Sequence, residues 1–386
     1  MIDISSKIKE NYPLKDLTTF HIGGPARYFM EVSSQDELVS ALDFAKDKGV
    51  SIYIIGGGSN ILFSDKGFDG LVIKPSLKGR EILNEDDQAV TLKTASGESL
   101  DDIVGWTVEQ GLCGMENLSF VPGLMAGLAV QNVNCYGHDA SNIIQAVEVF
   151  DTQDNSIKTL LNKECEFGYR RSIFNTTEKG KYVVLSVILK LSKKCKPVII
   201  YPDVMKWFEG RDHSTITLSE IREAIIEIRK GKDQDPVEHW SAGSFFRNLL
   251  LTDKEFEELH SNVEKNYGSE SAKGLVELRN RFSKVEDFYK SQTGVNDSAR
   301  KKEIKIPIAF ILDRVMGLKG TKVGDAMISE KQVICILNIG NATADDVMNL
   351  FKKVRQLVHK KTGMIVEPEP ELVGFGEEEL KEYFAL

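Results

Sequence analysis

A strand, a helix and a second strand that run into three consecutive glycines are the feature that most constrains the fold of this chain. Apolar residues at 27–32 and 50–55 have the length and pattern of strands. Between them, Ser34 and Glu37 form a capping-box pattern, which is typical of a helix start. The sequence therefore predicts a βαβ unit that delivers the chain into Gly56-Gly57-Gly58-Ser59-Asn60.

Glycines in such a loop let backbone N–H groups approach a ligand closely, and phosphate oxygens are their usual target. No Lys-Ser or Lys-Thr pair follows the glycines, which excludes a Walker loop. The spacing and the sequence after Asn60 also fail to match a Rossmann fingerprint. The loop is therefore interpreted as a phosphate site of another kind, or as a tight turn between two strands.

A second glycine-rich segment covers residues 121–137 and contains no charged side chain. An uncharged loop of this length is uncommon on a solvated surface. We expect it to form a backbone wall against a flat ligand. The alternative is a helix that packs closely through its small residues.

Charge and cysteine content exclude several classes of protein. The 386 residues include 49 Lys and Arg against 58 Asp and Glu, a net charge of −9, which argues against nucleic-acid or anionic-membrane partners. The five cysteines lack C-x-x-C spacing, so we expect no metal site and no disulfide framework, and a cytoplasmic location. The N-terminus lacks the apolar run of a signal peptide, and no stretch is long enough to span a membrane.

Further elements mark the organisation of the chain. Residues 182–191 are predicted to form a strand, and a helix is predicted to begin after Thr217 and to end near 229–232. Asp235-Pro236 then marks a domain boundary. Residues 253–303 are rich in Lys, Glu and Ser and are expected to be largely exposed, and a last long helix runs from Thr343 to Gly363.

Three segments carry side chains suited to catalysis or to ligand binding. Arg170 and Arg171 lie among apolar residues, so we expect at least one to point inward toward an anion. Ser244 stands before two phenylalanines, which suggests a hydroxyl held in a tight, partly apolar place. Prolines fix the backbone around Glu369, although this segment could also be an exposed acidic loop.

Together these motifs resemble the UDP-N-acetylenolpyruvoylglucosamine reductase family. The resemblance follows the chain in order over nearly its whole length. Its segments are Thr19-Phe20 with Gly23-Gly24-Pro25-Ala26, Gly56 to Asn60, Gly114-Met115-Glu116-Asn117-Leu118, Pro122-Gly123, Gln131-Asn132, Gly168-Tyr169-Arg170, Ala242-Gly243-Ser244-Phe245-Phe246 and Glu367-Pro368-Glu369.

The resemblance implies an α+β protein with two FAD-binding α/β subdomains of the vanillyl-alcohol-oxidase/PCMH type and a C-terminal α+β substrate-binding domain. Residues 1–78 would form the first subdomain, to which the tail 366–386 could return. Residues 79–233 would form the second subdomain with a Tyr201 loop, and residues 234–365 the substrate domain. The resemblance also implies a monomer with small-molecule partners only.

The reaction implied by the resemblance is NADPH-dependent, FAD-mediated reduction of the enolpyruvyl group of UDP-N-acetylglucosamine enolpyruvate. A hydride would reach C3 of that group and a proton C2, giving UDP-N-acetylmuramate. By position in the family, Arg170 and a protonated Glu369 would stabilise the developing charge, and Ser244 would give the proton.

Binding residues are implied by the same match. For the flavin they are Gly56, Gly57, Gly58, Ser59, Asn60, Pro122, Gly123, Gln131, Asn132 and Tyr136; for the sugar nucleotide or NADPH they are Tyr201, Arg229, Lys232, Asn248, Lys305 and Gln332.

This chain departs from the family pattern at a few positions: Ala129, Val130, Asn134, Cys135, Leu249 and Glu371. Two alternatives to the reductase remain open. One is another FAD-dependent oxidoreductase of the wider superfamily, and the other is a non-catalytic paralogue that binds flavin or a UDP-sugar.

Overall fold

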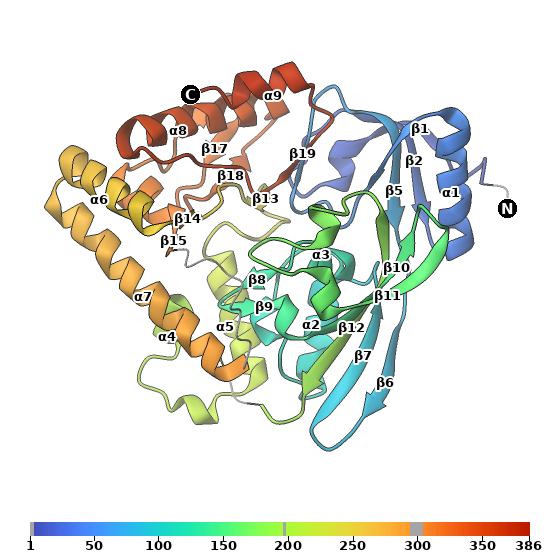
Figure 1. The fold of residues 1–386 in the computed structure, drawn as a ribbon, viewed down its shortest axis with the longest axis horizontal. Helices are drawn as coiled ribbons and strands as arrows, with labels where there is room; N and C mark the ends of the chain where they lie inside the picture. The colour runs from blue at the N-terminus through green and yellow to red at the C-terminus, as the bar shows by residue number, and fades with distance from the viewer. Residues whose placement is uncertain (1–3, 196–197, 294–303) are drawn as a thin grey trace. The chain divides into compact units, whose positions relative to one another are not determined.

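The structure is a computed structural model that describes residues 4–195, 198–293 and 304–386. The chain forms two compact units (Figure 1). Unit 1 comprises Met1–Pro13, Pro25–Ser59 and Phe68–Gly231, and unit 2 comprises Leu14–Gly24, Asn60–Gly67 and Lys232–Leu386. The three-domain division expected from the sequence stays a prediction.

The first sheet of unit 1 contains the predicted βαβ unit. Its strand order is β1-β2-β5-β3, and helix α1 packs against β2, β3 and β5. Ser34 caps α1 as predicted, but the Glu37 carboxylate accepts from the Ser33 amide instead of the Ser34 amide. The bounds are β1 Lys9–Pro13, β2 Pro25–Val32, α1 Gln35–Lys48, β3 Ser51–Ile54 and β5 Phe68–Pro75.

The second sheet of unit 1 is antiparallel, with order β11-β10-β12-β7-β6. The predicted strand at 182–191 is its long central strand β12, which buries neighbouring residues such as Val183 and Val184 on both of its faces. The bounds are β6 Arg80–Glu85, β7 Ala89–Ala95, α2 Leu100–Glu109, β8 Asn134–Cys135, β9 His138–Asp139, β10 Ile144–Asp151, β11 Ser156–Leu161 and β12 Tyr182–Ser192.

The expectation of one long loop over residues 121–137 was wrong. Residues Met125–Val130 form helix α3, which packs on β12 and β7. The alternative of a close-packed helix is therefore correct for this part, because Met125, Leu128 and Ala129 are fully buried against the sheet. The segments on either side of α3 keep the irregular backbone that the glycines indicate.

Unit 1 ends in two helices, α4 Pro202–Trp207 and α5 Leu218–Lys230. The predicted capping box at the start of α5 is confirmed, because Thr217 and Glu220 each accept from the other's backbone amide. The helix buries Ile221, Ala224 and Ile225 as its spacing indicates.

Unit 2 is built on the sheet β13-β18-β17-β16 and a largely helical cover. Helix α8 begins after Thr343 and ends at Gly363, as predicted. The bounds are β4 Ile61–Phe63, β13 Trp240–Ser244, β14 Leu249–Leu251, α6 Asp253–Tyr267, α7 Ser269–Thr293, β15 Ile304–Ile306, π-helical η7 Phe310–Val315, β16 Lys322–Val323, β17 Ala326–Ile328, β18 Cys335–Asn338, α8 Ala344–Thr362, β19 Glu371–Val373 and α9 Glu377–Tyr383.

Most residues of 253–281, the part of the 253–303 segment whose side-chain burial is described, are exposed, as expected. Its helices α6 and α7 bury Phe256, Leu259, Val263 and Leu275 in the core of unit 2, because these apolar residues recur at helical spacing among charged ones. Residues 294–303 lie outside the described part of the chain. Among the described residues, none of the helices has both the length and the apolar character that a membrane span requires.

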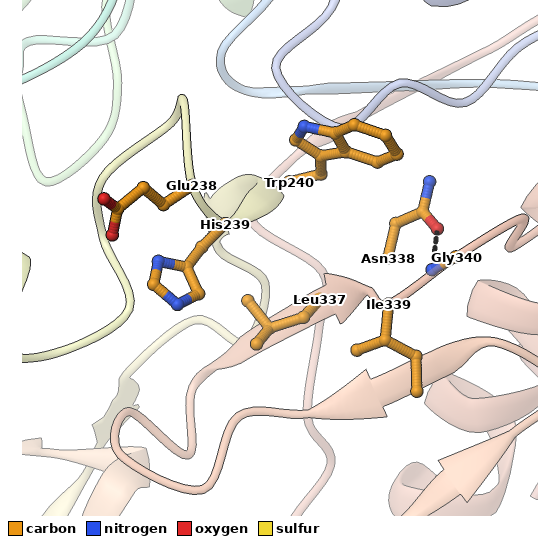
Figure 2. Close-up of a pocket in the computed structure, with 7 residues that line it drawn as sticks. All are labelled: Glu238, His239, Trp240, Leu337, Asn338, Ile339 and Gly340. Atoms are coloured by element: carbon orange, nitrogen blue, oxygen red, sulfur yellow. Dashed lines mark hydrogen bonds between the residues drawn. The ribbon is translucent and has the colours of Figure 1, made fainter.

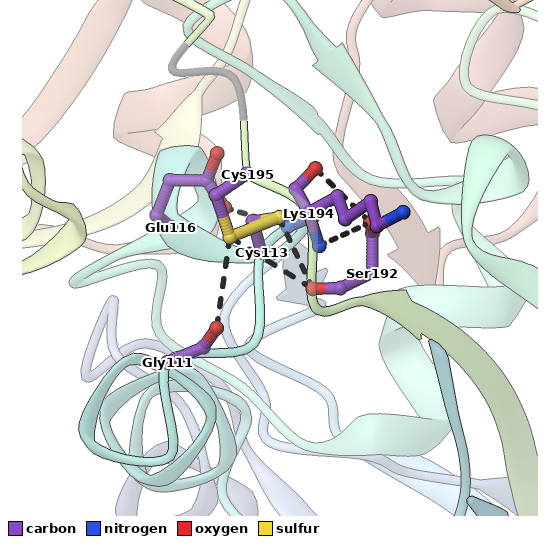
Figure 3. The surroundings of a disulfide bond; sticks show 7 residues. Gly111, Cys113, Glu116, Ser192, Lys194 and Cys195 are labelled. Carbon is purple, nitrogen blue, oxygen red and sulfur yellow. Dashed lines mark hydrogen bonds between the residues drawn. A yellow bond between two sulfur atoms is a disulfide. The ribbon is translucent and has the colours of Figure 1, made fainter. Parts of the chain in front are cut away.

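The expectation of no disulfide framework overlooked one bond, because the structure joins Cys113 to Cys195 (Figure 3). The two residues are 82 positions apart, and only the fold brings them together. Cys113 and Ser192 exchange backbone hydrogen bonds of 3.0 and 3.1 Å, which places Cys195 beside Cys113. Cys135, Cys165 and Cys335 take no part in a disulfide bond.

This pairing predicts the number of reactive cysteines. In denatured, unreduced protein, an alkylating reagent should label three cysteines, and after treatment with a dithiol it should label five. Mass spectrometry of peptides would locate the labels. Labelling of Cys113 and Cys195 before reduction would show that the two are thiols.

Candidate functional site

The two glycine-rich segments of unit 1 meet at Gly57 and Gly123. A Cβ atom on Gly57 would lie 2.6 Å from Gly123 Cα, which is too close for any residue other than glycine. The Ser59 hydroxyl donates to the Pro122 carbonyl oxygen at 3.1 Å and fixes the second segment to the first. The predicted phosphate loop and the predicted backbone wall are therefore one continuous surface.

This surface fits a phosphate-bearing cofactor such as FAD. None of the hydrogen bonds found among the described residues is donated by the backbone amides of Gly56, Gly57 or Gly58. Open space surrounds the position that a Cβ atom on Gly56 would take. Backbone amides without an acceptor inside the protein are suited to bind phosphate oxygens.

The contrast between Gly56 and Gly57 gives a matched pair of variants. Gly57→Ala should lower the free energy of unfolding by about 1–3 kcal/mol and release the flavin, because the methyl group meets the Gly123 backbone. Gly56→Ala should leave stability near wild type and weaken flavin binding only. Thermal unfolding and the flavin-to-protein absorbance ratio would check both. Full flavin loading in both variants would contradict this site.

Gln131, Asn132 and Arg170 are held together in unit 1. The Asn132 side chain donates to the Gly168 carbonyl oxygen at 2.8 Å and accepts from the Ser141 amide at 2.9 Å. Asn175 donates to both the Gln131 side chain (3.4 Å) and the Arg170 carbonyl oxygen (3.1 Å). Asn132 and Arg170 both have positive φ, 40° and 52°, a strained state that clusters at functional sites.

The Arg170 guanidinium points inward, as expected for one of the two arginines. It donates to the Asn134 carbonyl oxygen at 3.1 Å, whereas half of the Arg171 side chain is exposed. Asn134 belongs to the β8–β9 hairpin, whose turn carries Tyr136. Arg170 is therefore anchored to the same hairpin as a second predicted site residue.

Tyr136 and Tyr201 also meet in unit 1. Their ring centroids are 5.1 Å apart with the rings edge to face. Burial raises the pKa of the Tyr136 hydroxyl, so it is a protonated donor at neutral pH. The Arg229 guanidinium lies near this pair, since it donates to the Phe120 carbonyl oxygen at 3.0 Å and contacts Cys135 Sγ at 3.6 Å.

Asn117 bonds to the segments that carry Tyr136 and Tyr201, although the sequence analysis gave it no role. Its side-chain amide donates to the carbonyl oxygens of Tyr136 (3.0 Å) and Val198 (3.1 Å), and the residue is 2% exposed. It joins the Tyr136 turn to the segment that leads to Tyr201. Its place in the Gly114-to-Leu118 motif was the only signal in the sequence.

In unit 2, Ser244 ends strand β13 opposite Cys335 of β18. The pairing is irregular between Ser241 and Ser244, and Gly243 has φ +71°, which few other residues adopt easily. The next amide, that of Phe245, donates to the Ile334 carbonyl oxygen at 2.6 Å. This bulge fixes the direction in which the Ser244 side chain leaves the sheet.

Glu369 reaches the same strand end. Its amide donates to the Phe245 carbonyl oxygen at 2.8 Å, and Phe246 forms a bridge with Pro368. Glu369 is 9% exposed, so the alternative of an exposed acidic loop was wrong. Asn60 joins this segment too, because its side chain donates to the Glu369 carbonyl oxygen at 3.4 Å.

The remaining predicted residues of unit 2 lie on separate elements. Asn248 accepts from the Ile308 amide at 3.1 Å, and Lys305 pairs with Leu250 between β15 and β14. Gln332 lies in the turn between β17 and β18. Lys232 begins unit 2.

A shallow cavity of about 330 Å³ opens at the other end of β13 (Figure 2). Its walls include Trp240, whose ring lies 4.5 Å from that of His21. Trp240 begins β13 and Ser244 ends it, so this cavity is separate from the predicted reacting residues. The lining residues are Glu238, His239, Trp240, Leu337, Asn338, Ile339 and Gly340.

Comparison with known proteins agrees with this geometry. The family model "FAD binding domain" matches residues 26–160, and the model "UDP-N-acetylenolpyruvoylglucosamine reductase, C-terminal domain" matches residues 235–373. The crystal structure of UDP-N-acetylenolpyruvylglucosamine reductase (MurB) from Thermus caldophilus has the same fold. It superposes with a TM-score of 0.59 at 24% identity, covering 95% of this chain and 99% of that one.

Curated relatives match over nearly the full length. The UDP-N-acetylenolpyruvoylglucosamine reductase of Flavobacterium johnsoniae is 32% identical over 95% of this chain and 100% of the relative. The protein of the same name from Streptomyces coelicolor is 33% identical over 94% of this chain and 89% of the relative.

The fold and the glycine surface thus define an FAD-binding flavoprotein of the PCMH type with an added C-terminal domain. The chain belongs to the UDP-N-acetylenolpyruvoylglucosamine reductase family. It is accordingly a flavoprotein oxidoreductase of peptidoglycan synthesis, with the activity of a UDP-N-acetylmuramate dehydrogenase.

Proposed function

We propose that this enzyme uses NADPH to reduce the enolpyruvyl group of UDP-N-acetylglucosamine enolpyruvate, with Ser244, Arg170 and Glu369 as the catalytic residues. The observation that carries the proposal is the joint placement of Ser244 and Glu369 in unit 2. The backbone of Glu369 is bonded to Phe245, the residue that follows Ser244. Such coupling gives two reacting side chains a fixed relation to each other.

Bound FAD, once reduced, supplies a hydride from its N5 position. Addition of a hydride at C3 leaves negative charge at C2 and on the substrate carboxylate. The Arg170 guanidinium would stabilise this charge as a fixed cation, and a protonated Glu369 would donate a hydrogen bond to it.

Ser244 would complete the reaction by donating its hydroxyl proton to C2. A serine hydroxyl is a weak acid, so the transfer depends on placement more than on acidity. The bulge at Gly243 and the bond from Phe245 to Ile334 support such placement, because they restrict the backbone on both sides of Ser244.

The other predicted residues would bind the two nucleotides. Tyr201 would cover the uridine nucleotide, with Tyr136 beneath it. Basic side chains would neutralise the anionic ligands, which the net charge of −9 does not attract by itself. We assign this role to Arg229, Lys232 and Lys305, with Asn248 and Gln332 as polar contacts. We also propose a cytoplasmic monomer, in which the reducing environment would disfavour the Cys113–Cys195 bond until the protein is isolated.

Two half-reactions test the proposal separately. NADPH should bleach the flavin absorbance under anaerobic conditions, and UDP-N-acetylglucosamine enolpyruvate should restore it with formation of UDP-N-acetylmuramate. Tight binding of the sugar nucleotide without return of the absorbance would indicate a non-catalytic paralogue. Rapid oxygen-dependent oxidation of an alcohol or hydroxy acid would instead favour another oxidase.

A further inference from the structure

Asp233 is a buried carboxylate next to a predicted substrate residue. It follows Lys232, is 6% exposed and has φ +55°. Its carboxylate accepts from the Ser329 hydroxyl at 2.9 Å and pairs with Lys331 Nζ at 2.9 Å. His239 Nε2 lies 3.4 Å from Oδ1, the same carboxylate oxygen that Lys331 contacts. A buried charge in a left-handed backbone needs such partners to persist.

These partners keep Asp233 ionised. Burial by itself would raise the pKa of the carboxyl group. The hydrogen bonds from Lys331 and Ser329 outweigh burial and hold the pKa below its usual range. Asp233 is therefore a fixed acceptor for Ser329 throughout the neutral pH range.

The Ser329 hydroxyl uses its full hydrogen-bonding capacity. It donates to Asp233, and it accepts from the backbone amides of Lys331 (3.1 Å) and Gln332 (2.8 Å). A hydroxyl group has one donor and two acceptor sites, so all three are filled. Ser329 is fully buried, and water cannot replace any of these bonds without a rearrangement.

The turn that Ser329 closes also contacts the strand of Ser244. The Ser329 amide donates to the Cys335 carbonyl oxygen at 3.0 Å, and Cys335 is the strand partner of Ser244. The Ile334 carbonyl oxygen accepts from Phe245. The Ser329 hydroxyl thus links Asp233, which follows Lys232, to the turn that contacts the end of the Ser244 strand. It also bonds the Gln332 amide directly.

We propose that Ser329 and Asp233 are positioning residues that hold the 329–335 turn in the register required by Gln332 and Ser244. They touch no substrate themselves and act through the turn. The inference rests on the proposed function, because Gln332, Lys232 and Ser244 receive their roles there. A small displacement of the turn would slow the reaction of the sugar while leaving reduction by NADPH unchanged.

The test compares two buried serines of unit 2 by stopped-flow measurement of both half-reactions. In Ser329→Ala, the rate constant for reoxidation by the enolpyruvyl sugar should fall about tenfold or more, with reduction by NADPH near wild type. Ser64→Ala is the matched control: Ser64 is 1% exposed, and its hydroxyl accepts from Lys66, two residues on, as Ser329 accepts from Lys331. It should behave as wild type.

Two further variants separate positioning from general stability. Ser329→Thr keeps the hydroxyl and should recover most of the lost rate. Asp233→Asn keeps the shape of the side chain and should slow the sugar half-reaction while sparing reduction by NADPH. Equal rates in Ser329→Ala and Ser64→Ala, or an equal loss in both half-reactions of Ser329→Ala, would overturn the proposal.

The wild-type enzyme distinguishes this inference from the function on which it rests. If the enolpyruvyl sugar fails to reoxidise wild-type flavin, the proposed function is wrong. If the wild-type enzyme turns over the sugar, and the Ser329→Ala and Asp233→Asn variants each do so at the same rate, the proposed function stands. The positioning role is then wrong.

Discussion

Ser244→Ala is expected to separate the two half-reactions more sharply than any other single substitution. Reduction of the flavin by NADPH should proceed at the wild-type rate, because it needs no proton at C2 of the sugar. Reoxidation by the enolpyruvyl sugar should slow by about 10²–10⁴-fold, the usual contribution of a positioned general acid. Anaerobic stopped-flow absorbance would measure both rates.

Ser241→Ala is the control for this result. Ser241 lies on the same strand, and its hydroxyl accepts from the Gly243 amide at 3.2 Å. If loss of that hydroxyl slows the sugar half-reaction as much as loss of Ser244, the effect comes from distortion of the bulge. An unchanged rate in Ser244→Ala would mean that another group delivers the proton.

Arg170→Ala is expected to have the second-largest effect. Removal of the fixed cation should slow the sugar half-reaction by about 10²–10³-fold, because charge that develops in the transition state loses a preorganised partner. Arg170→Lys should recover only part of this rate, since an ammonium group cannot reproduce the planar guanidinium that bonds Asn134. The same stopped-flow measurement would report both variants.

The adjacent arginine provides the matched comparison. Arg171 is half exposed and lies 3.8 Å from Glu166, so Arg171→Ala should leave both half-reactions near wild type. If Arg170→Ala and Arg171→Ala slow the sugar half-reaction equally, the rate depends on positive charge in general and does not depend on the inward position of the Arg170 guanidinium. Flavin content should be measured in each variant, because Arg170 shares Asn175 with Gln131.

Local sequence signals predicted the regular elements well. Helices α5 and α8 begin at Thr217 and Thr343 because a threonine side chain there satisfies backbone amides of the first turn. Strand β12 follows from a continuous apolar run. Helix α3 was only the alternative interpretation of its segment, because glycine and alanine are ambiguous in isolation and only packing on β12 and β7 favours the helix there.

The same local signals could not predict contacts between residues far apart in the chain. Cys113 and Cys195 carry no spacing that indicates a pair, and the bond between them depends on the backbone bridge at Ser192. Asp233 and Ser329 are 96 positions apart and belong to no motif. Asn117 appeared in a motif, but its bonds to Tyr136 and Val198 depend on the course of two other segments.

The sequence by itself determined the family, the glycine loop and the identity of the candidate residues, because motifs in order along the chain record the chemistry that the fold must support. Only the tertiary structure decided which of these residues meet. It joined Gly57 to Gly123 and the Glu369 segment to the strand end of Ser244. The physical reason is that a motif restricts local backbone and side-chain chemistry, whereas a contact depends on packing and on hydrogen bonds between segments far apart in the chain.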